Sequence, residues 1–250
     1  MSPAATDPAC KVCGGPAPFF DACDLNSHCM RPESPDLLPA SGISVAYHRC
    51  RNCGFLFTGF MDGFTADDFR TRIYNEEYAR VDPGFEAARP RDNAAKLLGL
   101  FGDVPIRICD YGGGRGGTAL AINAAGRRLR AETWDPFFGS GQAPPGPFDM
   151  VVSIEVFEHS PTPAATLGQM LALTDANRLV LMGTLCQPDD IALQKTGWWY
   201  CSPRNGHISL HTRDSLSRLA DDAGVAVLHF NDSSHLFYDR LPAWIEGFVG

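Results

Sequence analysis

The chain has 250 residues, a formal net charge of −8 and 44% hydrophobic residues. This length fits one sizeable globular domain plus a small module, and no apolar run approaches the roughly 18–20 residues that cross a bilayer. A nucleic-acid binder usually carries a basic surplus to neutralise phosphates, so the acidic balance argues against DNA or RNA substrates. The opening MSPAATDPACKVC lacks the basic start and apolar core of a secretory signal, so we expect a cytoplasmic protein.

The first part of the chain carries the motif C-x-x-C-G twice. In such a knuckle two thiolates reach one ion from a tight turn, and the trailing glycine permits the backbone of that turn. Two knuckles supply the four sulfur ligands of a tetrahedral zinc site, and because such an ion keeps no position for water, the zinc is predicted to be structural. The predicted ligands are Cys10, Cys13, Cys50 and Cys53.

Other interpretations of these cysteines stay open at this stage. They could be small core residues or a redox pair. Cys23, His28 and Cys29 lie between the two motifs and could replace one ligand, although we expect them to bind nothing.

Strands and helices alternate from residue 91 onward, after a zinc-binding module at 1–60 and a connecting segment at 61–90. This order predicts a doubly wound, mostly parallel α/β sheet that binds ligands beyond the carboxyl ends of its strands. Threonines at the starts of the third and fourth helices are expected to act as N-caps. The predicted helices are 92–102, 116–126, 162–175 and 212–224, and the predicted strands are 104–111, 128–134, 148–154, 178–185, 225–230 and 235–241.

The stretch ICDYGGGRGG, residues 108–117, is a glycine-rich turn after an apolar strand. Its glycines let a ligand approach bare backbone, and the helix N-terminus that follows favours negative charge. The dinucleotide pattern G-x-G-x-x-G fits poorly here. Alternate glycines headed by Asp110 instead suit a zwitterionic amino-acid tail, although a generic turn without a ligand is the alternative.

Three segments together resemble the class I S-adenosylmethionine-dependent methyltransferases. Asp110-x-Gly-x-Gly-x-Gly resembles their first motif, Trp134-Asp135-Pro136 resembles the end of their second strand, and PFDMVVSIEVFEHSPTP at 147–163 resembles their next cofactor-lining segment. The resemblance runs over roughly residues 74–240 and implies a Rossmann-like methyltransferase sheet. It implies cofactor contacts at Asp110, Gly112, Gly114, Gly116, Asp135, Pro136, Ser153, Ile154 and Glu155.

The N-terminal module extends this resemblance to the sugar C-methyltransferases and their relatives in polysaccharide and natural-product pathways. Those proteins carry a tyrosine pair before the first motif, and Tyr74-x-x-x-Tyr78 stands at the matching place. The connecting segment is therefore expected to contribute to the cofactor pocket. A sugar or sugar nucleotide is the acceptor that the resemblance implies.

One departure concerns the adenine side of the site. Only 13 residues separate Asp135 from Asp149, and they include the loop-forming GSGQAPPGP at 139–147. The helix and strand that the family usually has there are predicted to be missing or reduced to this loop. How adenine is held is left open.

Methyl transfer requires positioning and a base, for which histidine is suited near neutral pH. His207 matches the basic histidine in the "EH-apolar-LFS" segment of the sugar C-methyltransferases, although Gly206 and Arg204 replace that family's glutamate and tyrosine. His159 is the second candidate base, by its resemblance to a cofactor-side histidine. A structural role for either histidine is the alternative.

Two further side chains near His207 are assigned on weaker grounds. Tyr200, with the Trp198–Trp199 pair, is a candidate wall of the acceptor site or an ordinary core residue. His211 is expected to face solvent or to cap the helix that follows it.

Two other function classes remain possible from the sequence. Ribosomal RNA guanine methyltransferases also carry an N-terminal cysteine module, but residues 1–60 hold four Lys or Arg against five Asp or Glu and so lack a basic face. The chain could also be another small-molecule methyltransferase, or a non-catalytic scaffold whose zinc module binds a partner protein. The sequence leaves the acceptor, the methylated atom and the oligomeric state unspecified.

Overall fold

The computed structural model describes residues 7–136 and 142–249. Among these residues, no helix is both long enough and apolar enough to cross a membrane. The chain divides into two compact units, each discontinuous in sequence. The first unit comprises residues up to 82, 158–164 and 185–219, and the second comprises 83–157, 165–184 and 220 onward.

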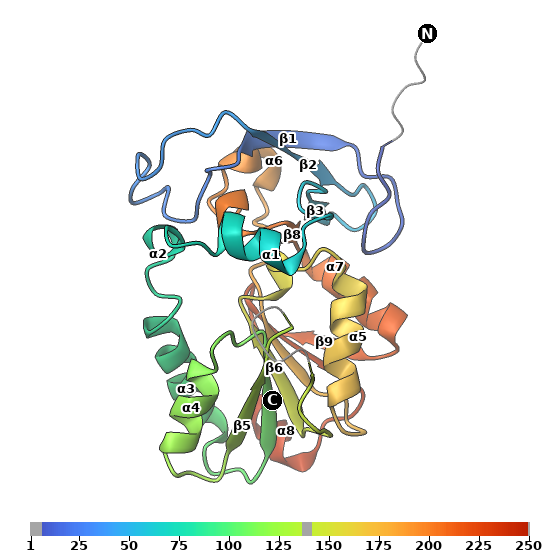
Figure 1. Ribbon diagram of the computed structural model, residues 1–250. Coiled ribbons are helices and arrows are strands. Elements are labelled where there is room, and N and C mark those ends of the chain that lie inside the picture. Colours follow the sequence, from blue (N-terminus) through green and yellow to red (C-terminus); the bar gives the residue numbers. More distant parts are fainter. Residues whose placement is uncertain (1–6, 137–141, 250) are drawn as a thin grey trace. The chain divides into compact units, whose positions relative to one another are not determined.

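The first unit contains a four-stranded antiparallel sheet in the order β1-β2-β3-β8 (Figure 1). The last strand comes from far along the chain, since Leu56 of β3 pairs with Leu210 of β8. The four strands are β1 (Phe19–Asp24), β2 (Ser44–Arg49), β3 (Leu56–Phe57) and β8 (Ser209–Leu210).

The helical elements of this unit are mostly short turns. The segment that links the cysteine module to the second unit is not extended but forms three of them, and the first begins with a capping box between Thr65 and Asp68. The turns are α1 (Ala66–Asp68), η1 (Phe69–Ile73), α2 (Tyr78–Val81), α6 (Ile191–Gln194), η3 (Lys195–Gly197) and η4 (Pro203–Asn205).

The second unit contains a six-stranded sheet in the order β5-β4-β6-β7-β10-β9. Neighbours among β5, β4, β6 and β7 run parallel, and β10 is antiparallel to both β7 and β9. The predicted mostly parallel sheet is therefore confirmed. Its strands are β4 (Arg107–Tyr111), β5 (Arg130–Trp134), β6 (Met150–Ile154), β7 (Val180–Gly183), β9 (Ala226–His229) and β10 (Ser234–Tyr238).

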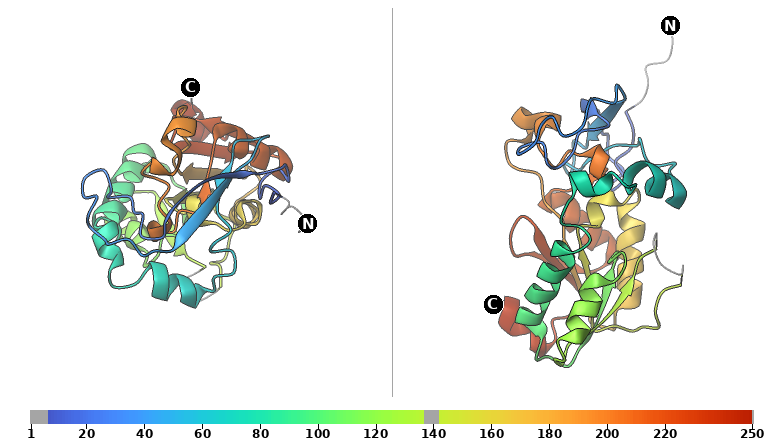
Figure 2. Two further views of the ribbon diagram at one scale, coloured as in Figure 1. Left: turned by 90° about the horizontal axis from the view of Figure 1, so that it is seen from above. Right: turned by 60° about the vertical axis from the view of Figure 1, so that its left-hand side comes forward.

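Helices cover both faces of this sheet, as doubly wound folds require. Helices α3 (Ala88–Phe101) and α4 (Gly117–Ala124) lie on one side and α5 (Pro163–Leu173) on the other (Figures 1 and 2). Helix α3 begins four residues before the predicted start, because a proline in the first turn of a helix is tolerated. Helix α8 (Ala243–Val249) adds Ile245 to the core beneath α3 and α4.

Helix α7 (Arg213–Ala223) has the predicted N-cap. The Thr212 hydroxyl accepts a hydrogen bond from the Ser215 amide at 3.0 Å, and the Thr212 amide donates to the Ser215 hydroxyl at 2.9 Å. Gly224 follows the helix with a φ of 66°, which fits the predicted stop.

The stretch between β5 and β6 is short, as expected. Residues 142–149 hold no helix or regular strand apart from an isolated bridge between Phe148 and Thr174. Part of the predicted loop at 139–147 lies outside the described residues. Strand β5 is the edge of the described sheet.

Candidate functional site

The glycine-rich turn connects β4 to α4 and has a backbone that other residues rarely adopt. Gly112, Gly114 and Gly116 have φ angles of 75°, 56° and 80°, all in the left-handed region. A Cβ atom at Gly112 would also lie 2.6 Å from the Val156 side chain. The left-handed backbone favours glycine at all three positions, and at Gly112 the close approach to the loop after β6 requires it as well.

Gly113, which the sequence analysis did not select, makes room for the buried acid of the turn. A Cβ atom there would lie 2.0 Å from Oδ2 of Asp110. At Gly114, by contrast, the corresponding space is open within 4 Å, so a ligand can reach the backbone there.

Asp110 is buried and only 6% exposed at the end of β4. Its Oδ2 accepts a long hydrogen bond of 3.5 Å from the Thr133 hydroxyl. The pKa of Asp110 is raised to about 7, mainly by burial, with a smaller upward contribution from the negative charge of Asp135 and an opposing one from the Thr133 hydrogen bond. No cation contributes to this pKa among the described residues. A buried carboxyl group in this situation is suited to a positively charged ligand, such as the ammonium group of an amino acid.

We expect Asp110→Asn to stabilise the ligand-free protein at high pH. Because burial raises the folded-state pKa from 3.8 to about 7, the favourable contribution is complete below about pH 4 and is lost as the pH rises toward 7 and above. At pH 8 the asparagine variant should be more stable by roughly 2–4 kcal/mol, while its affinity for a cationic ligand falls. Denaturant unfolding at pH 5 and pH 8 measures this difference.

Asp221→Asn, on the exposed surface of α7, is the matched control and should change neither quantity. A lower stability of Asp110→Asn at pH 8 would contradict the argument from burial.

Asp135 follows β5 and is tied to the glycine turn. Its Oδ2 accepts a hydrogen bond of 2.9 Å from the amide of Gly114. Because β4, β5 and β6 are parallel, their carboxyl ends meet at one edge of the sheet. The strand order reverses at β4, and such reversal points bind ligands in open α/β sheets. Pro136, the next residue, is exposed.

Two buried polar atoms at this edge have no hydrogen-bond partner within the described residues: Nε1 of Trp134 and Oγ of Ser153. Buried polar groups are normally paired, so these atoms are suited to a ligand or to water. Ile154 ends β6, and Glu155 beyond it has a φ of 56°, a strained value for a residue other than glycine. Strained backbone of this kind is concentrated at functional sites.

The three candidate catalytic side chains lie together in the first unit. The ring centroids of His159 and His207 are 5.0 Å apart, and those of Tyr200 and His207 are 4.2 Å apart. Nδ1 of His159 is 3.1 Å from the carbonyl oxygen of Gly206, and Nδ1 of His207 is 3.0 Å from that of Tyr200. Backbone carbonyls therefore fix the orientation of both imidazoles.

Glu158, which stands within the quoted segment 147–163 but was not predicted as a site residue, joins this cluster. It is fully buried, and its Oε1 accepts a hydrogen bond of 2.7 Å from the Tyr200 hydroxyl. The same oxygen is 3.9 Å from Nε2 of His159. The cluster thus holds a carboxylate, a phenol and two imidazoles.

Tyr74 and Tyr78 also belong to the first unit. Their ring centroids are 5.0 Å apart, and the Tyr74 ring is 6.2 Å from that of His159. Tyr78 is buried and donates a hydrogen bond of 3.4 Å to Asp82. The structure therefore groups Tyr74 with the histidine cluster.

Arg204 and Gly206, which replace the tyrosine and glutamate of the sugar C-methyltransferase pattern, both contact parts of the histidine cluster or its surroundings. The buried guanidinium of Arg204 donates to the carbonyl of Ile73 at 2.7 Å and to the Asn75 side chain at 2.8 Å, on either side of Tyr74. Gly206 has a φ of 87°, and a Cβ atom there would lie 3.0 Å from Nδ1 of His159. A larger residue at 206 would displace that imidazole.

The solvent-facing alternative for His211 was wrong. This residue is fully buried, its ring centroid lies 4.8 Å from that of Phe55, and its Nδ1 lies 3.2 Å from the Ser215 hydroxyl in the first turn of α7. The two-residue strand β8, which was not predicted, turns this segment inward. Of the tryptophan pair, Trp198 is buried and Trp199 is 40% exposed with its ring 5.2 Å from Tyr200.

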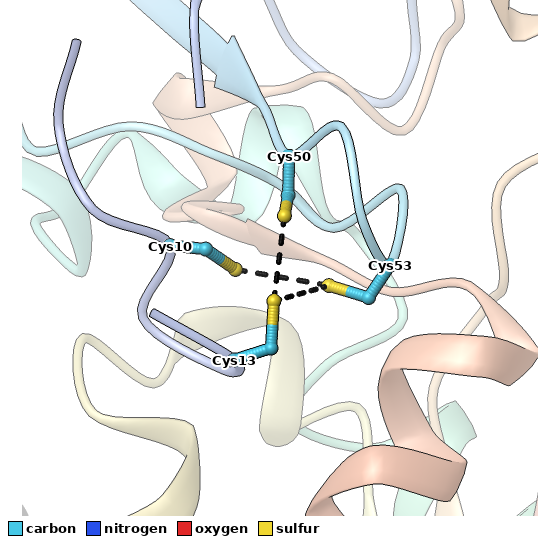
Figure 3. A group of neighbouring side chains, drawn as sticks. All are labelled: Cys10, Cys13, Cys50 and Cys53. Atoms are coloured by element: carbon cyan, nitrogen blue, oxygen red, sulfur yellow. Dashed lines mark hydrogen bonds between the residues drawn. The ribbon is translucent and has the colours of Figure 1, made fainter. Parts of the chain in front are cut away.

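The four cysteines of the two knuckles converge on one point (Figure 3). Both knuckles use the same backbone, with Gly14 and Gly54 at φ angles of 67° and 69°. In each, an amide donates to the first sulfur, from Val12 to Cys10 at 3.4 Å and from Asn52 to Cys50 at 3.3 Å. The equivalence of the two turns is that expected of paired metal-binding knuckles.

The sulfur spacing fits a tetrahedral ion. Sγ–Sγ distances are 3.5 Å for Cys13–Cys50, 3.6 Å for Cys13–Cys53 and 3.7 Å for Cys10–Cys53. A zinc–sulfur bond of about 2.3 Å gives tetrahedral edges of about 3.8 Å, whereas a disulfide requires about 2.05 Å. Cys29 lies elsewhere, with its sulfur 3.8 Å from Nδ1 of His207.

Comparisons with solved structures give low identities. The magnesium protoporphyrin IX methyltransferase of Synechocystis PCC 6803, solved with bound SAH, is 15% identical over 69% of this chain and 96% of its own, with a TM-score of 0.46. An O-methyltransferase family protein of Burkholderia thailandensis is 16% identical over 72% of this chain and 64% of its own, with a TM-score of 0.49. CalO1, a methyltransferase in calicheamicin biosynthesis solved in its SAH-bound form, is 17% identical over 73% of this chain and 63% of its own, with a TM-score of 0.45. The match thus spans nearly all of the first protein and less than two thirds of the other two.

Comparison with curated protein sequences returns no match. A family described as a methyltransferase domain matches residues 85–230, which is more than half of the chain. That range contains the glycine-rich turn, Asp135, and the histidine cluster with Glu158. The chain therefore belongs to this methyltransferase family and is an S-adenosylmethionine-dependent methyltransferase.

Proposed function

We propose that the chain transfers a methyl group from S-adenosylmethionine to a small polar acceptor of the sugar or sugar-nucleotide class. The observation that carries the proposal is the cluster of His159, His207 and Tyr200, which unites a possible base with an aromatic face. The acidic net charge of −8 disfavours RNA as the acceptor. Trp199, half-exposed beside Tyr200, offers a further aromatic face for a sugar ring.

The residues around the glycine turn fit the cofactor chemically. Asp110 would hold the ammonium group, the open backbone at Gly114 would lie against the methionine tail, and Asp135 would hold ribose hydroxyls. The sulfonium supplies an electrophilic methyl group when bound. Gly112, Gly116, Pro136, Ser153, Ile154, Glu155, Tyr74 and Tyr78 complete the proposed cofactor contacts.

The chain's own part in the reaction is to position the acceptor and take its proton. We assign this to His207, with His159 as its neighbour and Tyr200 orienting the acceptor. The acceptor's bond to hydrogen breaks as its electron pair forms the bond to the methyl carbon. The proton passes to the imidazole of His207, and S-adenosylmethionine held by the residues above would supply the methyl group and leave as the neutral thioether.

The cysteine cluster is proposed to hold a structural zinc ion. Its four sulfur ligands leave no position for substrate. In this organisation residues 1–60 are the zinc module, 61–90 contribute to the cofactor site and 91–250 form the methyltransferase domain.

Isothermal calorimetry with S-adenosylmethionine and its demethylated product tests the cofactor part of the proposal. We expect binding of both, weakened by Asp135→Ala because the variant loses the carboxylate that Gly114 anchors. Binding of neither would refute it. Transfer of a labelled methyl group to a panel of nucleoside-diphosphate sugars, with RNA as the competing arm, tests the acceptor class.

A further inference from the structure

Glu158 is a buried carboxylate held within the histidine cluster. It is 0% exposed and belongs to the short helix η2 (Phe157–His159). Its side chain accepts the Tyr200 hydroxyl at 2.7 Å, and its main-chain oxygen accepts the amide of Ile208 at 2.9 Å. Both bonds tie it to the segment that carries His207.

The two imidazoles have a defined tautomer when neutral. A carbonyl oxygen only accepts, so the contacts of 3.1 Å and 3.0 Å place the hydrogen on Nδ1 in His159 and His207. The lone pair is then on Nε2, and in His159 this atom is 3.9 Å from Oε1 of Glu158. A proton that binds to Nε2 of His159 therefore produces an imidazolium beside the Glu158 carboxyl group.

A buried imidazolium needs a compensating charge. Oε1 of Glu158 is close enough to supply it, and the hydrogen bond from the Tyr200 hydroxyl orients the carboxyl group. Among the described residues, the other titratable or charged groups around the two imidazoles include Cys29, Tyr47, Tyr74, Tyr78 and Arg204. Arg204, the cation of that set, donates to Ile73 and Asn75.

We propose that Glu158 is a positioning residue of the methyl transfer, which stabilises the imidazolium that forms when the acceptor loses its proton. This inference rests on the proposed function, since it assigns a counter-charge to the imidazole pair that contains the proposed base, His207. Glu158 acts through His159 and Tyr200, and its charge sets the pH at which the imidazole pair takes up a proton.

NMR titration of the full-length, zinc-loaded protein tests the proposal without an acceptor. In Glu158→Gln the shape is kept and the charge is removed, so the imidazolium loses its counter-charge. The titration midpoint of His159 should fall by about one pH unit or more, with a smaller fall at His207. Glu246→Gln, exposed on α8, should leave both midpoints unchanged. An unchanged His159 midpoint in Glu158→Gln would overturn the proposal.

Tyr200→Phe is the second variant and keeps the test decisive if the glutamine variant does not fold. The variant keeps the Glu158 carboxylate but removes the hydroxyl that donates a hydrogen bond to it. The carboxylate charge is then less compensated and stabilises the imidazolium more, so the titration midpoint of His159 should move upward by a few tenths of a pH unit. No upward movement there would overturn the proposal as well.

Turnover separates this inference from the proposed function. If the wild type methylates an acceptor, the acid limb of its kcat/KM profile should move to lower pH in Glu158→Gln by the same amount as the NMR midpoint of His207, the proposed base. A purely structural role would lower kcat without moving the limb. If the wild type methylates none of the acceptors but the midpoints shift, the proposed acceptor class fails and the role of Glu158 in the proton equilibrium stands.

Discussion

Replacing Cys50 with serine is expected to release the zinc ion and unfold the four-stranded sheet of the first unit. Cys50 follows directly after the end of β2 at Arg49, and its sulfur lies 3.5 Å from that of Cys13. Structural zinc contributes about 10–16 kcal/mol of apparent binding free energy in small zinc-dependent folds, far more than one hydrogen bond or one buried methyl group. Metal analysis should change from one zinc per chain to none, and thermal unfolding should begin at a much lower temperature.

Cys23→Ser is the matched control because Cys23 contacts the Cys201 carbonyl at 4.0 Å and lies outside the cluster. It should retain zinc. Wild-type protein purified under reducing conditions without zinc, yet stably folded, would refute the metal site.

Replacing His207 with glutamine is expected to lower turnover by roughly 10²–10⁴-fold. The amide can still donate to the Tyr200 carbonyl, and the Tyr47 hydroxyl still bonds the main-chain oxygen of residue 207 at 2.7 Å, so the loop should keep its conformation. What is lost is a group that accepts a proton near neutral pH. Calorimetric affinity for S-adenosylmethionine should therefore stay within about twofold while kcat falls.

His229→Gln supplies the control, since His229 lies on β9 and contacts His235 at 2.9 Å between their Nδ1 atoms. Its turnover should match the wild type. Equal turnover for His207→Gln would remove this histidine from the mechanism and leave His159 as the base to test.

The sequence predicted best the features that repeat or have a strict backbone requirement. The alternation of apolar runs with helical patterns after residue 91 was sufficient for a mostly parallel sheet, because each of those elements is long enough to show its period. The two C-x-x-C-G motifs predicted a convergence of four sulfurs. The acid-headed glycines predicted a sharp turn after the first strand of this sheet. The burial of Asp110 and the role of Gly113 become visible only from the structure.

Short elements and long-range contacts could not be predicted in the same way. Strand β8 has two residues, too few for a period, and it exists because β3 offers it a pairing edge. That pairing buries His211, for which solvent exposure had been an expectation. Glu158 could have been found as a site residue from its place beside His159 in the quoted motif, but its partner Tyr200 is distant in sequence.

The pairing of β3 with β8 also sets the order in which this protein can be completed during translation. All four proposed zinc ligands have been synthesised once Cys53 is added to the chain, yet the strand that closes their sheet starts at Ser209. At about 5–20 residues per second the nascent chain waits roughly 10–30 s with β3 as an open edge. An N-terminal fragment expressed alone would keep that edge permanently and would be prone to associate through it.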